Sequence, residues 1–521
     1  MHHLQHNEKH HDDVSSVRKS ETLHEAAPHV EEKGVNQDAL AVDAFEEALG
    51  ADHDAAGHIN YRSMGWIKAG ALIMAETIAL GILSFPSVFH RLGMFGGVFT
   101  TVAMAVLSWQ TGYVLVEFKN NHPGVMNFAD AGTVIAGKWG FWLFGSMLII
   151  KTVFLAGSHA LSGSIALGSI SDHAICNIAW SVIVAVVSFL CVVYHYFLFL
   201  LALGPGTEWV RMDARLTVPR TFEKVSYISF VSVTAILAAC FVTIIASGVQ
   251  PPKDLPKYPS LGPVAWHAFE NHGLIDTINA ITNIIFAYGG HVAIFSFASE
   301  MRNPADFKYS LALVQTVATI FYVIVGATVY KYGGQYVTSP ALTMTSRPVR
   351  ITAYSIALIS IVVAGVVASY VGAKFVFLTL FRGSPRLTSR SWRTWGIWVA
   401  ICATIWTIGW IIAEVIPTSY FFSDLLSIIS SILTVWFTYG LSGVLWLYDN
   451  GPRGARNKGK GYSYREAYFR GWKQIVGFSI SMFVIVMSAA IMVLGMYSAI
   501  SSIKDNYSEG NYGHPFSCGS S

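Results

Sequence analysis

Charged side chains are scarce in this sequence. Of 521 residues only 12% are Asp, Glu, Lys or Arg, against roughly 25% in soluble globular proteins, and 53% are hydrophobic. Residues 1–65 hold 13 acidic and 5 basic side chains, whereas the other 456 residues hold 18 acidic and 29 basic ones. This composition excludes a soluble multidomain enzyme, a secreted disulfide scaffold and a nucleic-acid-binding protein. It predicts an all-α polytopic membrane protein preceded by a disordered, acidic, cytosolic tail over residues 1–65.

Cysteine is rare as well. The five cysteines, Cys176, Cys191, Cys240, Cys402 and Cys518, lie far apart, with no CxxC pair and no Cys/His cluster. Most of them lie in or beside apolar runs, where a thiol usually behaves as a small hydrophobic group. The sequence therefore predicts no disulfide framework, no metal site and no cofactor.

Long apolar runs, by contrast, are abundant. A helix needs about 20 apolar residues to cross the hydrocarbon layer of a bilayer. Eleven runs meet this requirement, at 66–89, 94–116, 140–167, 177–200, 225–247, 278–300, 309–331, 350–380, 394–416, 420–447 and 474–498. The loops after the even-numbered runs hold 19 Lys and Arg residues, against 7 in the other loops and the C-terminal tail. The N-terminus is therefore predicted to be cytosolic and the tail at 501–521 non-cytosolic.

Two of these runs contain residues that interrupt a helix. The first run has Gly81 and Pro86, and the sixth has the pair Gly289-Gly290. Glycine costs about 1 kcal/mol and proline about 3 kcal/mol relative to alanine in a helix, and freed backbone groups cannot stay unsatisfied in lipid. One break alone would indicate a simple kink. Two breaks five runs apart predict a five-plus-five inverted repeat with discontinuous first and sixth helices, in which repeat one covers about 66–247, repeat two about 278–447, and 474–498 is an extra span.

The breaks also predict where a substrate binds. N–H groups at the start of a half-helix suit a carboxylate, and carbonyls at the end of one suit an ammonium, so an α-amino acid fits both. We expect the backbone of Gly81, Ile82 and Leu83 to hold the carboxylate, and carbonyls around Ala79 and from Phe286 to Gly289 to hold the amine. A pocket walled by Phe286, Tyr288 and Ile82 favours apolar or aromatic substrates. The predicted substrate-binding residues are Ala79, Gly81, Ile82, Leu83, Phe286, Ala287, Tyr288, Gly289 and Gly290.

Three ionisable residues lie inside the apolar runs near these breaks. An ionisable side chain at the centre of a membrane helix costs about 2.5–3.5 kcal/mol, which makes each one a functional candidate. Glu76 lies one helical turn before the first break, Lys151 lies deep in the third run, and His291 follows the glycine pair. All three are candidates for proton coupling. The alternatives are that Lys151 only balances the charge of Glu76, and that His291 is a hydrogen-bonded packing residue.

The segments 76–86, 283–300, with its Phe-Ala-Tyr-Gly-Gly-His core, and 440–450 resemble the amino acid/auxin permease family of the amino acid–polyamine–organocation superfamily. The likeness is strongest to fungal neutral amino-acid permeases and covers about residues 60–500. It implies eleven spans and proton-driven symport of neutral amino acids by a protein that is not an enzyme. Ser369 lies where related carriers place a cation site. Ala79 departs from the family, which usually has a glycine at that position.

Several further expectations follow from this resemblance. Residues 195–218 depart from the family pattern, and we hypothesise that they are a translated intron. The likeness favours the plasma membrane over the vacuolar membrane, and the tail at 1–65 is a candidate binding segment for trafficking or ubiquitination machinery. Two other functions stay open: an amino-acid-sensing receptor built on a transporter scaffold, and a vacuolar amino-acid exporter.

Overall fold

The computed structural model describes residues 61–79, 81–193, 221–256, 262–387, 391–415, 422–457, 461–508 and 516. Within these residues the fold is helical, and the β-type pairing is a single isolated bridge between Met64 and Met301. The all-α class predicted from the sequence is confirmed. Residues 1–60 of the predicted tail and the predicted insert at 195–218 lie outside the described residues.

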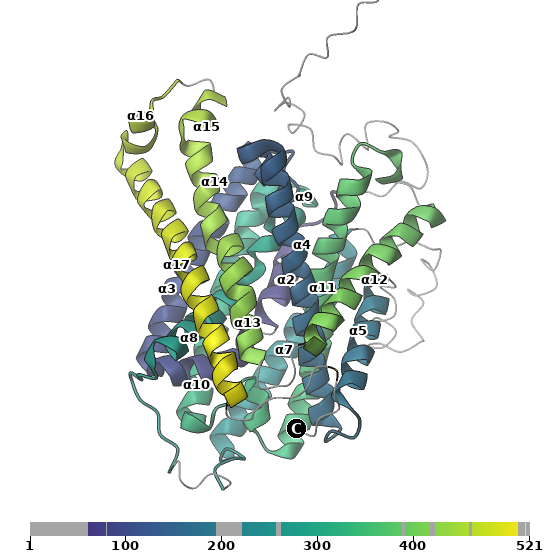
Figure 1. Ribbon diagram of the computed structural model, residues 1–521, viewed down its shortest axis with the longest axis vertical. Coiled ribbons are helices and arrows are strands. Elements are labelled where there is room, and N and C mark those ends of the chain that lie inside the picture. The colour runs from purple at the N-terminus through teal and green to yellow at the C-terminus, as the bar shows by residue number, and fades with distance from the viewer. Residues whose placement is uncertain are drawn as a thin grey trace, which may run out of the picture. The chain divides into compact units, whose positions relative to one another are not determined.

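Nine helical segments of the described chain are long and apolar enough to cross a membrane, and a shorter apolar helix covers Asn177–Val193. The long helices are built from the following elements, labelled in Figure 1: α2 (Trp66–Ile78), α3 (Phe85–Asn121), α4 (Phe128–Ile170), α5 (Asn177–Val193), α7 (Phe222–Val249), α8 (Gly273–Ala287), α9 (Ile294–Ser299), α10 (Phe307–Gly333), α11 (Arg347–Phe381), α12 (Trp392–Val415), α13 (Phe422–Ile429), α14 (Leu441–Asn450) and α17 (Trp472–Ser508). Two short helices, α15 (Pro452–Asn457) and α16 (Tyr464–Phe469), connect α14 to α17.

The first long segment, Trp66–Asn121, contains two predicted spans. They meet at Gly93, whose φ of 78° and ψ of 168° kink α3 between the predicted runs 66–89 and 94–116. A Cβ at Gly93 would lie 2.6 Å from the Cα of Phe269, so only glycine suits both this backbone conformation and this close approach. Since α5 covers the described part of the fourth run, helices are found at every one of the eleven predicted runs.

The helices pair as a repeat of five spans requires. The first span, α2, packs on the fifth and seventh spans, α7 and α10, and the sixth span, α8, packs on the tenth and second, α13 and α3. In the same way the third span, α4, packs on the ninth, α12, and the eighth, α11, packs on the fourth, α5. The eleventh span, α17, lies beside α13 and α14 (Figure 1). The predicted five-plus-five core with one appended helix is confirmed.

Small residues bring these helices close together. Gly157 of α4 faces Gly409 of α12, and a Cβ at Gly157 would lie 2.6 Å from the carbonyl oxygen of Gly409. Lipid tails are as apolar as leucine, so membrane helices associate through such close backbone packing rather than through the hydrophobic effect. This contact fixes the third span against the ninth.

One cysteine differs from the expectation. Cys191, Cys240 and Cys402 are free and buried. Cys176, in the connection between α4 and α5, is disulfide-bonded, so the expectation that the cysteines form no disulfide is wrong at this residue. Spacing along the chain does not show which segments meet in space, and that distance decides whether two cysteines can pair. Disulfides persist in oxidising compartments, which agrees with the predicted non-cytosolic position of this loop.

Candidate functional site

The first predicted break interrupts the first span. Helix α2 ends before Ala79, a 3-10 turn covers Gly81–Ser84, and Pro86 lies in the first turn of α3. Proline is well suited to that position because the N–H it lacks would have no partner within the helix. The Ser84 hydroxyl donates to the carbonyl of Gly81 at 2.8 Å and satisfies one of the acceptors that the break frees.

The second break interrupts the sixth span in the same manner. Helix α8 ends at Ala287, Tyr288 follows, a 3-10 turn covers Gly289–Ala293, and α9 begins at Ile294. Both first and sixth helices are therefore discontinuous at the residues that the sequence indicates. Leu80, inside the first break, lies outside the described residues.

The two breaks lie against each other. A Cβ built on Gly81 would lie 2.6 Å from the Cβ and 2.7 Å from the Cα of Ala287. A Cβ on Gly290 would collide with the hydroxyl oxygen of Thr77, near the end of α2. Glycine is thus required at both positions for the half-helices to approach, and the predicted substrate-binding residues of the two repeats form one continuous region.

Tyr322 of α10 joins the two breaks. Its hydroxyl oxygen lies 2.8 Å from the carbonyl oxygen of Thr77 and 2.8 Å from that of Ala287, which belong to the ends of α2 and α8. Its ring stacks on Phe85 with a centroid distance of 4.3 Å. Sequence reasoning missed this residue, because nothing in its spacing distinguishes it from the other tyrosines of the chain.

Lys151 reaches the second break from the third span. Its side chain is buried, and its Nζ donates to the carbonyl of Gly289 at 2.9 Å. The ammonium also lies 5.5 Å from the centroid of the Phe437 ring, within the range of a cation–π interaction. Lys151, predicted from the sequence as a proton-coupling candidate or as the charge partner of Glu76, therefore contacts the second break directly.

Glu76 lies in α2, one turn before the first break. Both of its carboxylate oxygens are buried, and they accept no hydrogen bond from any residue that the structure describes. The ammonium of Lys151 is the opposite charge that acts on it, although no direct ion pair joins these two described side chains. An unpartnered carboxylate inside a membrane protein is costly. The two oxygens of Glu76 are therefore open to a proton or to an ammonium group.

His291 lies between two backbone carbonyls. Its Nε2 lies 2.9 Å from the carbonyl oxygen of Ser108 in α3, and its Nδ1 lies 3.2 Å from that of Tyr288 at the break. Carbonyl oxygens only accept hydrogen bonds, so both contacts are satisfied together only when both ring nitrogens carry a proton. These two contacts favour the imidazolium form of His291, whereas its burial and the nearby Lys151 ammonium oppose it.

The other predicted side chains are buried or partly buried. Ile82 and Leu83 are buried in the core and Phe286 is partly buried. The Tyr288 side chain turns toward α10, where its hydroxyl lies 3.1 Å from that of Thr319. The hydroxyl of Ser369 donates to the carbonyl of Val366 within its own helix at 3.0 Å.

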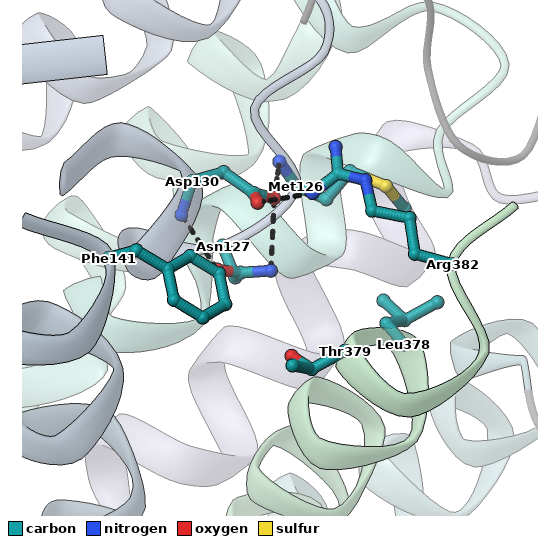
Figure 2. Close-up of a pocket in the computed structure, with 7 residues that line it drawn as sticks. All are labelled: Met126, Asn127, Asp130, Phe141, Leu378, Thr379 and Arg382. Carbon is teal, nitrogen blue, oxygen red and sulfur yellow. Dashed lines mark hydrogen bonds and ion pairs between the residues drawn. The ribbon is translucent and has the colours of Figure 1, made fainter. Parts of the chain in front are cut away.

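A separate cavity of about 70 Å³ lies between the start of α4 and the end of α11, and its lining includes none of the residues of the breaks (Figure 2). The Asp130 carboxylate pairs with the Arg382 guanidinium at 2.6 Å and accepts from the backbone of Met126 and the side chain of Asn127, both at 3.0 Å. The pair between Asp130 and Arg382 fastens the third span to the eighth.

Comparison with known proteins identifies the family. A family model described as "Transmembrane amino acid transporter protein" matches residues 62–197 and 213–501. The chain belongs to this family. It is therefore a transporter and not an enzyme, and the family resemblance of its motifs is confirmed. The match omits residues 198–212, which lie within the predicted insert.

Two relatives of this transporter are named as amino acid transport proteins. The N amino acid transport system protein of Neurospora crassa is 28% identical over 466 residues, which cover 89% of this chain and 90% of that protein. Vacuolar amino acid transporter 4 of Saccharomyces cerevisiae is 26% identical over 267 residues, 51% of this chain and 34% of that protein. Among solved structures, MHP1, a nucleobase-cation-symport-1 family transporter in a closed conformation, has a TM-score of 0.50 at 15% identity and covers 87% of this chain and 96% of its own. That similarity establishes a shared fold.

Proposed function

We propose that this transporter imports neutral amino acids with apolar or aromatic side chains, by proton symport with alternating access. The observation that carries the proposal is the direct contact between the two helix breaks, where Gly81 packs on Ala287. Half-helix ends meeting inside a membrane offer donors to a carboxylate and acceptors to an ammonium. The likeness to the N amino acid transport system protein of Neurospora crassa supports amino acids as the substrate class.

The substrate carboxylate binds the backbone of Gly81, Ile82 and Leu83, at the start of the second half of the first span. The amine binds carbonyls between Phe286 and Gly289 and near Ala79. Tyr322 adds to this arrangement because its hydroxyl holds the two half-helix ends at a fixed separation. Substrate binding and the relative position of the repeats are coupled through this region.

His291 binds the coupled proton. The carbonyls of Ser108 and Tyr288 stabilise its imidazolium form, and loss of the proton leaves one of these carbonyls without a donor. Since the Tyr288 carbonyl belongs to the break, protonation changes the hydrogen bonding of the substrate site itself. Glu76, with its unpartnered oxygens, is the second proton-binding candidate.

Contacts on both sides of the breaks support alternating access. Toward the end of the sixth span, the buried Glu300 carboxylate pairs with Lys374 and accepts from the backbone N–H of Phe222 at 2.6 Å. Toward the other side, the N–H of Met94 donates to the carbonyl of His267 at 2.9 Å, next to the kink at Gly93. The Phe222–Glu300 bond joins the two repeats, and the Met94–His267 bond joins repeat one to the connection between the repeats. Each set must open in turn for a substrate to pass from one side to the other.

The transporter resides in the plasma membrane with its N-terminus in the cytosol. The distribution of Lys and Arg in the loops supports this orientation, and the disulfide at Cys176 agrees with it. An epitope tag at each end, stained in intact and in permeabilised cells, tests both the membrane and the orientation.

The function is tested by uptake of labelled neutral amino acids into proteoliposomes, with and without an inward proton gradient. Uptake should rise with the gradient and collapse with a protonophore. His291→Gln should keep exchange of amino acids but lose stimulation by the gradient, because an amide has no charged form. Uptake that ignores the protonophore contradicts proton symport, and binding without flux indicates a sensing receptor.

A further inference from the structure

The acceptors at the second break already have donors from the protein. The carbonyl of Ala287 shares the proton of the Tyr322 hydroxyl with the carbonyl of Thr77, and that of Gly289 is bound by the Lys151 ammonium. The carbonyl of Tyr288 faces the Nδ1 of His291. Buried carbonyls need such partners, because an unsatisfied one is costly away from water. An incoming amine must therefore displace a donor that belongs to the protein.

Lys151 is the donor that matches the substrate amine chemically. Both are ammonium groups, so one can replace the other at a carbonyl without a change of charge there. The Lys151 side chain is only 1% exposed, and its single hydrogen bond, to Gly289, leaves two of its three donors without an acceptor among the described residues.

Glu76 provides a second position for that ammonium. Its two buried oxygens have no hydrogen-bond partner, and its charge attracts that of Lys151. The lysine thus has one occupied acceptor at the break and one vacant acceptor in the first span. A flexible four-carbon side chain can move between two such acceptors.

We propose that Lys151 is a resident substitute for the substrate's α-ammonium group. In the substrate-free carrier it satisfies the Gly289 carbonyl. When an amino acid binds, the substrate ammonium takes that carbonyl, and the Lys151 ammonium moves to the Glu76 carboxylate. This inference rests on the proposed amino-acid transport, and it names the group that the substrate must bring: an ammonium that still carries an N–H.

The exchange of ammonium groups has a consequence for the transport cycle. The loaded carrier has its Gly289 carbonyl satisfied by substrate and does not need Lys151 at that position. The empty carrier must return to the state that accepts new substrate, and during this return Lys151 alone donates to the Gly289 carbonyl. Lys151 is therefore required for the return of the empty carrier and much less for the movement of the loaded one.

The test compares net uptake with exchange in purified Lys151→Met reconstituted into proteoliposomes. Net uptake into liposomes without internal amino acid should fall about tenfold or more, since the empty carrier keeps an unsatisfied carbonyl. Exchange against internal unlabelled amino acid should fall by at most about threefold relative to wild-type exchange. The double variant Lys151→Met with Glu76→Gln removes both charges. If it also loses net uptake and keeps exchange, the effect does not come from a Glu76 carboxylate left without its lysine.

Lys374→Met combined with Glu300→Gln is the matched control, because it leaves no buried carboxylate unpaired. It also removes a buried intramembrane ammonium, but one that pairs with Glu300 and not with a break. We expect it to reduce net uptake and exchange by similar factors. Equal loss of both activities in the folded Lys151 variants, or retention of both, overturns the proposal. Failure of the wild-type protein to transport any amino acid in either assay would instead overturn the proposed function.

Discussion

Replacing Gly81 by alanine tests the contact on which the site is built. The added Cβ would lie 2.6 Å from the Cβ and 2.7 Å from the Cα of Ala287, whereas carbon atoms pack at about 3.5–4.0 Å. The two half-helices must therefore separate by about 1 Å. Because one of the close atoms is backbone, no change of rotamer relieves the collision.

This separation is expected to reduce the rate of transport strongly and the stability of the fold only modestly. Inserting a methyl group into a packed interior costs about 1–3 kcal/mol, which a membrane domain of this size tolerates. Misplacing binding groups by about 1 Å reduces the rate of a positioned reaction by about a hundredfold. We therefore expect Gly81→Ala to reach the membrane at near wild-type levels while its initial rate of uptake falls by one to two orders of magnitude.

The assay is initial-rate uptake of a labelled amino acid, normalised to the amount of protein in the liposomes. Gly396→Ala in α12 is the control, because a Cβ there meets nothing within 4 Å. Adding Ala287→Gly to Gly81→Ala should restore only part of the activity, since the Cα of residue 287 remains close. Uptake by Gly81→Ala within twofold of wild type would refute the reasoning that the two breaks form the site.

Three further predictions follow from other residues. Tyr322→Phe leaves the carbonyls at the ends of α2 and α8 without their hydroxyl donor, so thermal unfolding in detergent should show a loss of about 1–3 kcal/mol together with reduced uptake. Lys374→Met leaves the buried Glu300 carboxylate unpaired and should destabilise the protein by about 3–5 kcal/mol, and Glu300→Gln in the same chain should recover much of that stability in the same measurement. Sequencing of the transcript should show that the codons for residues 195–218 are absent from the mature message; a message that contains them removes the intron hypothesis.

The positions of the breaks could be predicted because their cause is local. Gly81, Pro86 and the pair Gly289-Gly290 each raise the free energy of a continuous helix, and that cost is visible in the sequence alone. The spacing of the two breaks then indicates the inverted repeat. Hydrophobic run length predicted the spans with similar success, except that the second half of the first span and the second span are joined in the single helix α3, which is kinked at Gly93.

The partners of the polar residues could not be predicted, because they come from distant parts of the chain. Lys151 meets Gly289 across 138 positions, and Tyr322 meets Thr77 across 245. Local propensity and periodicity carry no information about such contacts. The sequence marked Lys151 as costly and therefore interesting, but only the packing of the third span on the second break shows what it binds.

The isolated bridge at Met64 anchors the start of the described chain to the sixth span. The N–H of Met64 donates to the carbonyl of Glu300 at 3.1 Å, and the N–H of Arg302 donates to the carbonyl of Met64 at 3.0 Å. The Tyr61 hydroxyl donates to the carbonyl of Leu387 at 3.1 Å. A truncated protein that starts at residue 61 keeps these bonds, whereas one that starts at residue 66 loses them. Tension applied to the acidic tail by a bound protein or a fused tag is therefore transmitted directly to the helix that carries the second break.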